Sequence, residues 1–412
     1  VLLAALPALT ACAGPPVQPL MPTPILYPEL GIGPLDHVPP ESRWKPRLVY
    51  YATTRARVSD LQRINYSNDE SEQVAVGMAL VGFGGPQVSW ADLDRYSRQA
   101  TREGVVNLSI SGLLEAGVYD PTLPAVQTPA SDSVKWMLAE MNASIEAARD
   151  RDLLIYVHGA KVNFYNACVF AAQLDHFMGR DMTSMAFAWP TRQNIISYGT
   201  GGDVERAYRH AHALTSLLER LAAGSVARRI HIVAWSAGGR LVTEALDELH
   251  DRHAGAGESL RDRFRIGTVY LAAADVPGDE FITALPKLNE VAQRIAVTAS
   301  ENDGALRMAQ RFMGGQTRIG TVTGPLPEDL DTIVRAADRL EVIDVSRGSE
   351  RRGFDISGHR YWFDHPWTSS DLILAVRSDL GPDERALQKE PYPVLWSIPA
   401  DYPERLREAL RR

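Results

Sequence analysis

With 412 residues, of which 45% are hydrophobic, the chain can bury a large core, and its length allows either several domains or one large α/β unit. A net charge of −8 without a long basic run argues against nucleic acid as a partner. Cys12 and Cys168 are the only cysteines, so neither a disulfide framework nor a cysteine metal site is expected, and no apolar stretch is long enough to span a membrane.

The first twelve residues have the pattern of a secretory signal. Residues 1–8 are apolar but too few to cross a bilayer, and Leu9-Thr10-Ala11-Cys12 follows them. This tetrapeptide resembles the lipobox of bacterial lipoproteins, whose cysteine becomes the acylated N-terminus of the mature protein. We therefore expect the printed sequence to begin inside such a signal, and Cys12 to be lipidated. Alanine rather than aspartate at position 13 implies the outer membrane, on its periplasmic face, if the host has two membranes. The alternative is an ordinary secretory signal in which Cys12 occurs by chance.

Residues 13–46 are predicted to be an extended, semi-rigid tether. Proline fixes φ and removes a backbone donor, so a proline-rich segment is unsuited to a helix or a central strand. A folded domain is predicted over residues 47–380, with a C-terminal extension over 381–412. The prolines of the tether are Pro15, Pro16, Pro19, Pro22, Pro24, Pro28, Pro34, Pro39, Pro40 and Pro46.

The predicted domain alternates strands with helices. Residues 76–83 and 105–110 are expected to pair antiparallel at one edge. The run over 153–159, which is apolar up to Val157, is typical of a buried parallel strand. Repeated alternation predicts an α/β fold with a mostly parallel central sheet and helices on both faces. The predicted strands are 47–55, 76–83, 105–110, 153–159, 182–189, 230–233, 266–274, 294–299 and 340–345, and the predicted helices are 131–149, 164–177, 204–223, 241–249, 281–291 and 369–377.

Ser236 stands between the apolar strand 230–233 and the helix 241–249. The surrounding Ala234-Trp235-Ser236-Ala237-Gly238 has the pattern of a nucleophile elbow, a tight strand-to-helix turn that exposes a serine, with alanine in place of the first glycine. The helix N-terminus behind the serine offers free N–H groups and a positive dipole end, which suit an oxyanion. The alternative is an ordinary strand–turn–helix with a chance serine.

Other polar residues also follow predicted strands. His158-Gly159-Ala160 ends one strand, Asp275 and Asp303 follow two later ones, and His359 comes after the last. Ligands of parallel sheets bind beyond the carboxyl ends of the strands, so these residues can form one site. The order serine, aspartate, histidine is the order found in α/β-hydrolases.

An ordered series of short motifs runs through the predicted domain. The motifs are Tyr51-Ala52-Thr53-Thr54-Arg55, His158-Gly159, Trp189-Pro190-Thr191, Tyr198, Asp203, Trp235-Ser236-Ala237-Gly238, Ala273-Ala274-Asp275, residues 300–306 and Gly358-His359-Arg360-Tyr361. With this series, the region from Arg47 to about Asp371 resembles the α/β-hydrolase fold and, more narrowly, the bacterial esterase/lipase-like family DUF900. The family's elbow usually reads His-Ser-Met-Gly, and an aromatic residue and an asparagine usually follow its His-Gly, where this chain has Ala160 and Lys161. These departures leave the shape of the substrate pocket open.

The elbow and the resemblance assign roles to these residues. Ser236 is the expected nucleophile, and His359 is the base that activates it and then protonates the leaving group. His365 is a rival for the histidine, although it precedes Pro366 and is expected to introduce the last helix.

The remaining roles are to hold the histidine and to bind the oxyanion. Asp303 is the expected acid, with Asp275 as the alternative. The backbone N–H groups of Ala160 and Ala237 are expected to form the oxyanion hole.

These assignments predict a serine hydrolase that cleaves a small acyl ester, anchored by lipid in the cell envelope. No metal or organic cofactor is expected, and the sequence does not indicate an oligomeric state. The alternative from another class is a catalytically silent lipoprotein of this fold that binds an envelope partner or a glycan.

Overall fold

The computed structural model describes residues 18–58, 64–124, 130–192, 201–255, 257–312, 315–324, 328–347 and 358–411. The predicted signal over 1–12, Cys12 and the first residues of the predicted tether lie outside this set. No helix in the described ranges is both long and apolar enough to cross a membrane.

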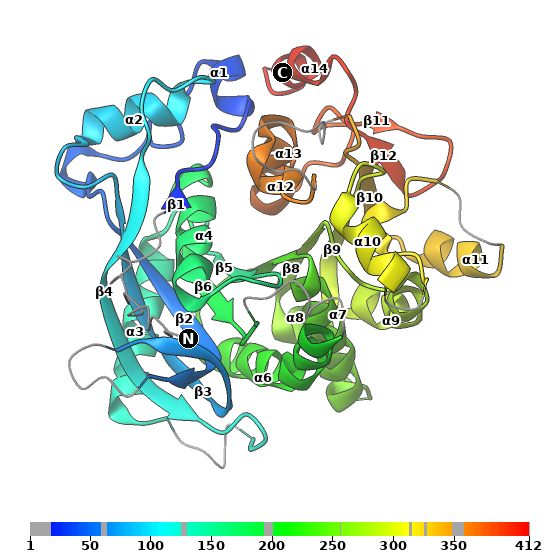
Figure 1. Cartoon of the computed structure of the whole chain (residues 1–412), viewed down its shortest axis with the longest axis horizontal. Helices are drawn as coiled ribbons and strands as arrows, with labels where there is room; N and C mark the ends of the chain where they lie inside the picture. Colours follow the sequence, from blue (N-terminus) through cyan, green and yellow to red (C-terminus); the bar gives the residue numbers. More distant parts are fainter. Residues whose placement is uncertain are drawn as a thin grey trace, which may run out of the picture.

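Within the described residues, twelve strands form a single sheet that runs through the molecule (Figure 1). Their spatial order is β1-β4-β3-β2-β6-β5-β7-β8-β9-β10-β12-β11. The strands are β1 (Gln18–Pro19), β2 (Arg47–Arg57), β3 (Tyr66–Phe83), β4 (Asn107–Tyr119), β5 (Leu153–Val157), β6 (Thr183–Ala188), β7 (Ile230–Trp235), β8 (Ile266–Ala272), β9 (Ala292–Ala299), β10 (Leu340–Asp344), β11 (Gln388–Lys389) and β12 (Leu395–Ser397).

The sheet is mostly parallel. Every neighbouring pair from β2 to β12 is parallel. The antiparallel pairs lie at the edges, where β2, β3 and β4 form a long meander, as predicted for residues 76–83 and 105–110. Because the carboxyl ends of the parallel strands all point to one edge of the sheet, the loops that follow them meet there.

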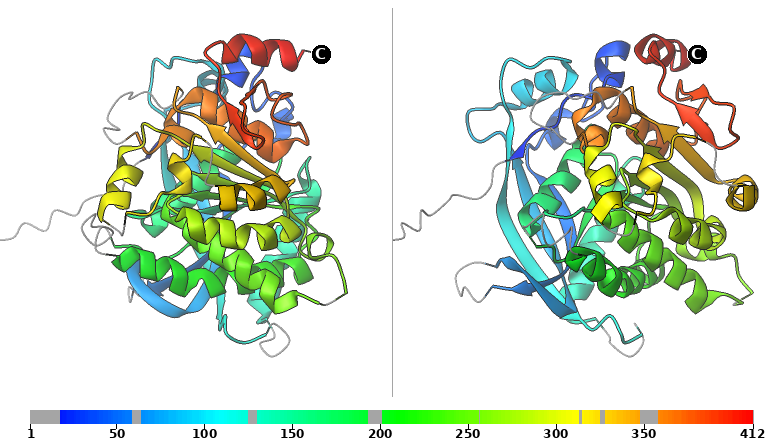
Figure 2. Two further views of the ribbon diagram at one scale, coloured as in Figure 1. Left: turned by 90° about the vertical axis from the view of Figure 1, so that its right-hand side faces the viewer. Right: turned by 45° about the vertical axis from the view of Figure 1, so that its right-hand side comes forward.

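Helices cover both faces of the sheet (Figure 2). Successive residues of β5 alternate between the two cores: Leu153 and Ile155 pack with α3, α6, α7 and α9, while Leu154 and Tyr156 pack with α4 and α13. This confirms the predicted α/β architecture. The helices and helical turns are α1 (Leu26–Leu30), η1 (Pro40–Ser42), α2 (Trp90–Arg98), α3 (Asp132–Ala147), α4 (Phe164–Phe177), α6 (Gly202–Gly224), α7 (Ala237–His253), α8 (Leu260–Phe264), α9 (Gly278–Val291), α10 (Gly304–Phe312), η2 (Ile319–Thr321), α11 (Glu328–Ala336), α12 (Tyr361–Asp364), α13 (Pro366–Arg377) and α14 (Tyr402–Ala409).

The predicted tether is wrong for residues 18–46, which pack on the domain. Leu20, Met21 and Tyr27 are buried. The N–H of Met21 donates to Oε1 of Gln173 at 2.6 Å, and β1 pairs antiparallel with the start of β4. Proline interrupts regular structure but does not stop the apolar residues between the prolines from being buried.

The predicted domain end at residue 380 is also too early, because residues 381–411 complete the sheet. Strand β12 pairs parallel with β10. Arg385 is fully buried and contacts the carboxylates of Asp371 and Glu341, each at 2.8 Å. Helix α14 lies beside α1, where Nε of Arg407 donates to Glu29 at 3.0 Å (Figure 1). The two terminal segments therefore belong to the same folded unit.

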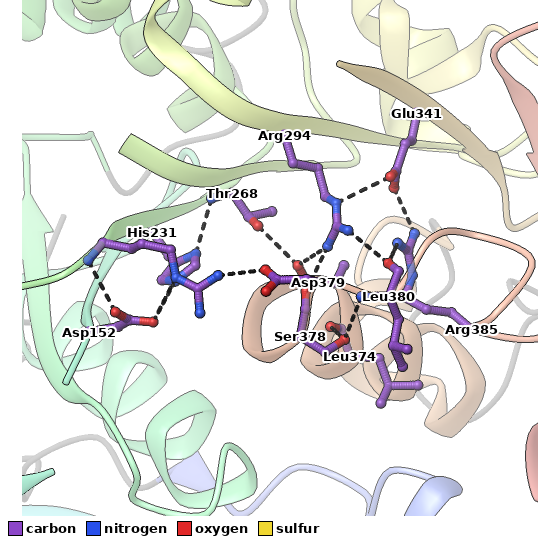
Figure 3. A network of polar contacts seen from close by, with 12 residues as sticks. Asp152, His231, Thr268, Arg294, Glu341, Leu374, Ser378, Asp379, Leu380 and Arg385 are labelled. Carbon is purple, nitrogen blue, oxygen red and sulfur yellow. Dashed lines mark hydrogen bonds and ion pairs between the residues drawn. The ribbon is translucent and has the colours of Figure 1, made fainter. Parts of the chain in front are cut away.

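A polar network ties together the amino ends of the central strands, at the edge opposite the loops of the site (Figure 3). His231 of β7 contacts Asp152 just before β5 at 3.3 Å and accepts a hydrogen bond from the N–H of Thr268 on β8 at 3.0 Å. Arg294 of β9 contacts Glu341 of β10 at 3.2 Å and donates to the last carbonyls around α13. The polar groups of this buried edge are thus satisfied by side chains, which favours a structural role.

Candidate active site

Four loops that follow parallel strands bring the predicted residues together. Ser236 follows β7, Asp303 follows β9, and His359 lies between β10 and α12. Gly159 and Ala160 lie between β5 and α4. All four loops leave the carboxyl edge of the sheet, so residues more than a hundred positions apart become neighbours.

Ser236 occupies a sharp turn with a positive φ. Its dihedrals are φ 54° and ψ −123°, and it precedes the first residue of α7. A non-glycine residue in such a conformation is uncommon and costs on the order of 1–3 kcal/mol. Two hydrogen bonds fix its carbonyl oxygen, one from the N–H of Gly239 at 2.9 Å and one from the N–H of Asp275 at 3.1 Å.

Close approach of β5 to the elbow explains two glycines. A Cβ on Gly238 would lie 2.6 Å from the carbonyl oxygen of His158, and a Cβ on Gly159 would lie 2.9 Å from Cβ of Ser236. Any larger residue at either position would push the loop between β5 and α4, which contains Ala160, away from the serine. These contacts explain the small residues around the predicted elbow.

Ser236, His359 and Asp303 form a continuous hydrogen-bonded chain. Nε2 of His359 lies 2.8 Å from Oγ of Ser236, and Nδ1 lies 2.8 Å from Oδ2 of Asp303. Asp303 is fully buried, and its other oxygen accepts the N–H of Leu306 at 3.0 Å. The carboxylate is therefore held at both oxygens and fixes the imidazole with Nε2 toward the serine.

Trp235 supports the same histidine. Its Nε1 donates to the carbonyl oxygen of His359 at 3.3 Å, and the two rings lie 5.6 Å apart. The residue that precedes the serine therefore also holds the loop that carries the histidine.

Asp275, the alternative acid, lies in a different set of contacts. Its carboxylate contacts Arg240 at 3.3 Å and Arg318 at 2.9 Å, and all three side chains are buried. Burial raises the pKa of Asp275 to about 7, while Arg318 opposes this shift. The geometry thus pairs His359 with Asp303, and Asp275 braces the elbow through its N–H.

The rival histidine is placed elsewhere by the fold. His365 precedes α13 and is its N-cap, with Nδ1 accepting the N–H of Trp367 at 3.2 Å. It thus introduces the last helix, as its position before Pro366 indicates.

The two predicted oxyanion donors flank the serine. Ala237 is the first residue of α7, where a helix leaves its N–H groups without intrahelical acceptors. Ala160 directly follows Gly159, which touches the serine turn. Both N–H groups therefore belong to backbone beside Ser236.

Arg55 and Trp189 belong to the pieces that resemble the family, but the sequence assigned them no role, and the structure places both against the loop of residues 158–162. Arg55, at the carboxyl end of β2, is buried and donates to the carbonyl oxygen of Val162 at 2.6 Å. Trp189, after β6, donates from Nε1 to the carbonyl oxygen of His158 at 2.7 Å. A charged residue at the end of an otherwise apolar predicted strand was the available signal for Arg55.

Nothing in the described part of the chain forms a cluster of three or more His, Cys, Asp or Glu side chains able to hold a metal ion. Cys168 is buried inside α4, and burial raises the pKa of its thiol.

Comparison with known proteins identifies the family of the chain. A search of curated proteins found no match. The family described as alpha/beta hydrolase of unknown function (DUF900) matches residues 135–374, more than half of the chain, and this range contains Ser236, Asp303 and His359. The chain belongs to this α/β-hydrolase family, DUF900.

Proposed function

We propose that the protein is a serine hydrolase that cleaves an acyl ester through an acyl-serine intermediate. The observation that carries the proposal is the unbroken chain from Oγ of Ser236 through His359 to the buried carboxylate of Asp303, with 2.8 Å at each step. A serine hydroxyl is a poor nucleophile unless a base removes its proton, and this chain provides the base and holds its tautomer.

The chemistry follows from these positions. Nε2 of His359 accepts the proton of Ser236 as Oγ attacks the ester carbonyl. The N–H groups of Ala160 and Ala237 stabilise the oxyanion, and Asp303 stabilises the imidazolium. His359 then gives the proton to the leaving alcohol, and a water molecule releases the acid from the acyl-serine by the same steps.

Labelling and kinetics test this proposal. A fluorophosphonate should modify Ser236, as located by mass spectrometry, and a short-chain p-nitrophenyl ester should be hydrolysed. Ser236→Ala and His359→Ala should each lower kcat by roughly a thousandfold or more, and the double variant should lose little further activity, because the residues act as a unit. Since only neutral imidazole accepts the serine proton, kcat/KM should rise with pH through one ionisation.

His365→Asn is the matched control, because asparagine can still cap α13, and it should keep the wild-type rate. A folded wild type that is neither labelled nor active on esters, thioesters or amides would contradict the proposal and favour a silent binding module.

Lipid anchoring at Cys12 is a separate part of the proposal and rests on the resemblance of residues 9–12 to a lipobox. Expressed in a bacterial host behind a secretory signal that ends in residues 9–12, the protein should carry acyl groups on Cys12 and fractionate with membranes. Stable anchoring takes at least two acyl chains. Cys12→Ala should yield soluble or unprocessed protein, and processing and fractionation identical to wild type would exclude the anchor.

A further inference from the structure

Arg55 is a buried cation without a carboxylate beside it. The residue is 1% exposed and belongs to none of the ion pairs among the described residues, although the charge of Asp203 acts on it from beyond ion-pair distance. Burial lowers the pKa of Arg55 to about 9, so the guanidinium stays charged at neutral pH. Burying an unpaired charge is costly, so the contacts that it does make warrant a reason.

Those contacts join β3 to the loop between β5 and α4. Nη1 donates to Asn68 at 2.7 Å, and Nη2 donates to the carbonyl oxygen of Val162 at 2.6 Å. Nη2 also lies 3.5 Å from Nε2 of His158. One guanidinium therefore holds both ends of the segment 158–162, which contains Ala160.

His158 links the guanidinium of Arg55 to the backbone of the loop. Its Nδ1 lies 2.8 Å from the carbonyl oxygen of Gly159, and since a carbonyl can only accept, Nδ1 carries the proton and donates. Nε2 is then the unprotonated nitrogen, which faces the Arg55 donor. Burial and the Arg55 charge lower the pKa of His158 to about 3, which agrees with a neutral ring.

The carbonyl held by His158 belongs to the same peptide group as the N–H of Ala160. No described peptide bond is cis, so this C=O and N–H point in opposite directions. The imidazole of His158 binds the carbonyl oxygen of Gly159, and in doing so it also sets the direction of the N–H of Ala160, which points the opposite way. Trp189 fixes the preceding carbonyl in the same way and stacks on the imidazole with ring centroids 5.5 Å apart.

We propose that Arg55 is a positioning residue of the oxyanion hole, acting through His158 and Val162 to orient the N–H of Ala160. This inference rests on the proposed hydrolase function. It predicts that loss of Arg55 reduces the stabilisation of the transition state more than the affinity for substrate, because the oxyanion forms only when the serine attacks.

Kinetics of Arg55→Met test the proposal. We expect kcat on a p-nitrophenyl ester to fall about 10- to 100-fold with KM changed less than about threefold, a smaller loss than removal of an oxyanion donor itself. Phosphonylation of Ser236 should slow by a similar factor, because the phosphonyl oxygen needs the same donors. Arg55→Lys keeps the charge but not the forked geometry, and should recover only part of the rate.

Arg206→Gln is the matched control. Arg206 is also largely buried and donates to the carbonyl oxygen of Asn68 at 3.0 Å, next to the Arg55 contact, but its other partner is Glu70. This variant should keep the wild-type kcat. Equal losses in both variants, full rescue by Arg55→Lys, or a wild-type rate in folded Arg55→Met would each overturn the proposal.

His158→Phe covers the case in which Arg55→Met does not fold, because phenylalanine keeps the stacking on Trp189 but removes the donor to Gly159. It should show the same selective loss of kcat, and an unchanged rate would overturn the proposal. The ¹⁵N shifts of His158 provide a readout that does not depend on activity. Wild type should show a protonated Nδ1 and an Nε2 that accepts a hydrogen bond, and the Nε2 shift should move in folded Arg55→Met because its donor is gone. An unchanged Nε2 shift would overturn the role of Arg55. A wild type that a fluorophosphonate does not label would contradict the proposed function. The ¹⁵N shifts of His158 would still test its contact with Arg55 in that case.

Discussion

At the scale of single residues, the site separates two aspartates that the sequence left as alternatives. Both follow neighbouring strands, and both are fully buried. Asp303 contacts His359, whereas Asp275 contacts Arg240 and Arg318. One carboxylate is placed to act on the histidine, and the other neutralises two guanidinium groups behind the elbow.

This difference predicts opposite effects for the two asparagine variants. Asp303→Asn should lower kcat by about 10³–10⁴-fold with little change in stability, because an amide favours the wrong histidine tautomer. Because burial raises the pKa of Asp275 to about 7, its carboxylate is mostly ionised only above that pH. At about pH 8.5, Asp275→Asn therefore removes the negative charge between two buried arginines and should cost about 3–5 kcal/mol in unfolding free energy, with a smaller effect on kcat. Urea denaturation and steady-state kinetics of both variants check this. A loss of kcat in Asp275→Asn without a loss of stability would exchange the assignments.

The candidate site could be predicted from the sequence because its chemistry follows the order of the strands. Ser236 and Asp303 each come within a few residues of a strand, His359 follows the last predicted strand after a longer loop, and parallel strands bring such loops to one edge. Arg55 could not be predicted in the same way. Its role depends on contacts with Val162, which lies 107 positions away, and no local pattern records that distance.

At the scale of elements, prediction succeeded where a segment is buried on both faces. Strand β5 is a continuous apolar run, β7 and the second half of β9 are mostly apolar and buried, and all three were located within a few residues. Strands β3 and β4 extend well beyond the predicted ranges 76–83 and 105–110. Their outer parts face solvent on one side, so polar residues interrupt the apolar pattern that prediction relies on.

The terminal segments show a different limit. Residues 18–46 were predicted to be a tether because proline content describes local backbone preference only. Leu20, Met21 and Tyr27 are buried by contacts with distant parts of the chain, such as Gln173 and the carbonyl of Phe177. Whether such a segment packs on the domain depends on its tertiary contacts, which its amino-acid composition does not reveal.

At the scale of the whole molecule, the fold buries histidines that it keeps neutral. Burial is the main cause of the lowered pKa in each case, and an unfolded chain would expose these rings to water. Unfolding below about pH 6.5 should therefore take up protons at these positions. The pKa is lowered to about 3 for His158 and to about 4 for His210, is held well below its ordinary value for His176, and is also lowered for His231.

His176 allows this effect to be measured at one residue. It is fully buried on α4, its Nε2 lies 2.7 Å from Oγ of Ser97, and Arg180 donates to its Nδ1 at 3.4 Å. Burial is the largest cause that holds its pKa well below the ordinary value, and Arg180, Arg102 and Arg47 add to it. His176 therefore stays neutral in the folded state at a pH at which it binds a proton in the unfolded state. Its contribution to stability is complete above the pKa of the unfolded state and is lost as pH falls.

We therefore expect that, on acidification, the unfolding free energy of the wild type decreases relative to that of His176→Gln. Between pH 6 and pH 5 the difference should change by about 1 kcal/mol, close to the 1.4 kcal/mol per pH unit of one proton. Glutamine can still donate to Ser97 but cannot titrate, so other ionisable groups cancel in the comparison. Urea denaturation of both proteins at pH 7.5, 6 and 5 gives the difference directly. A difference that stays constant over this range would mean that His176 is protonated in the folded state or that the unfolded state also keeps it neutral.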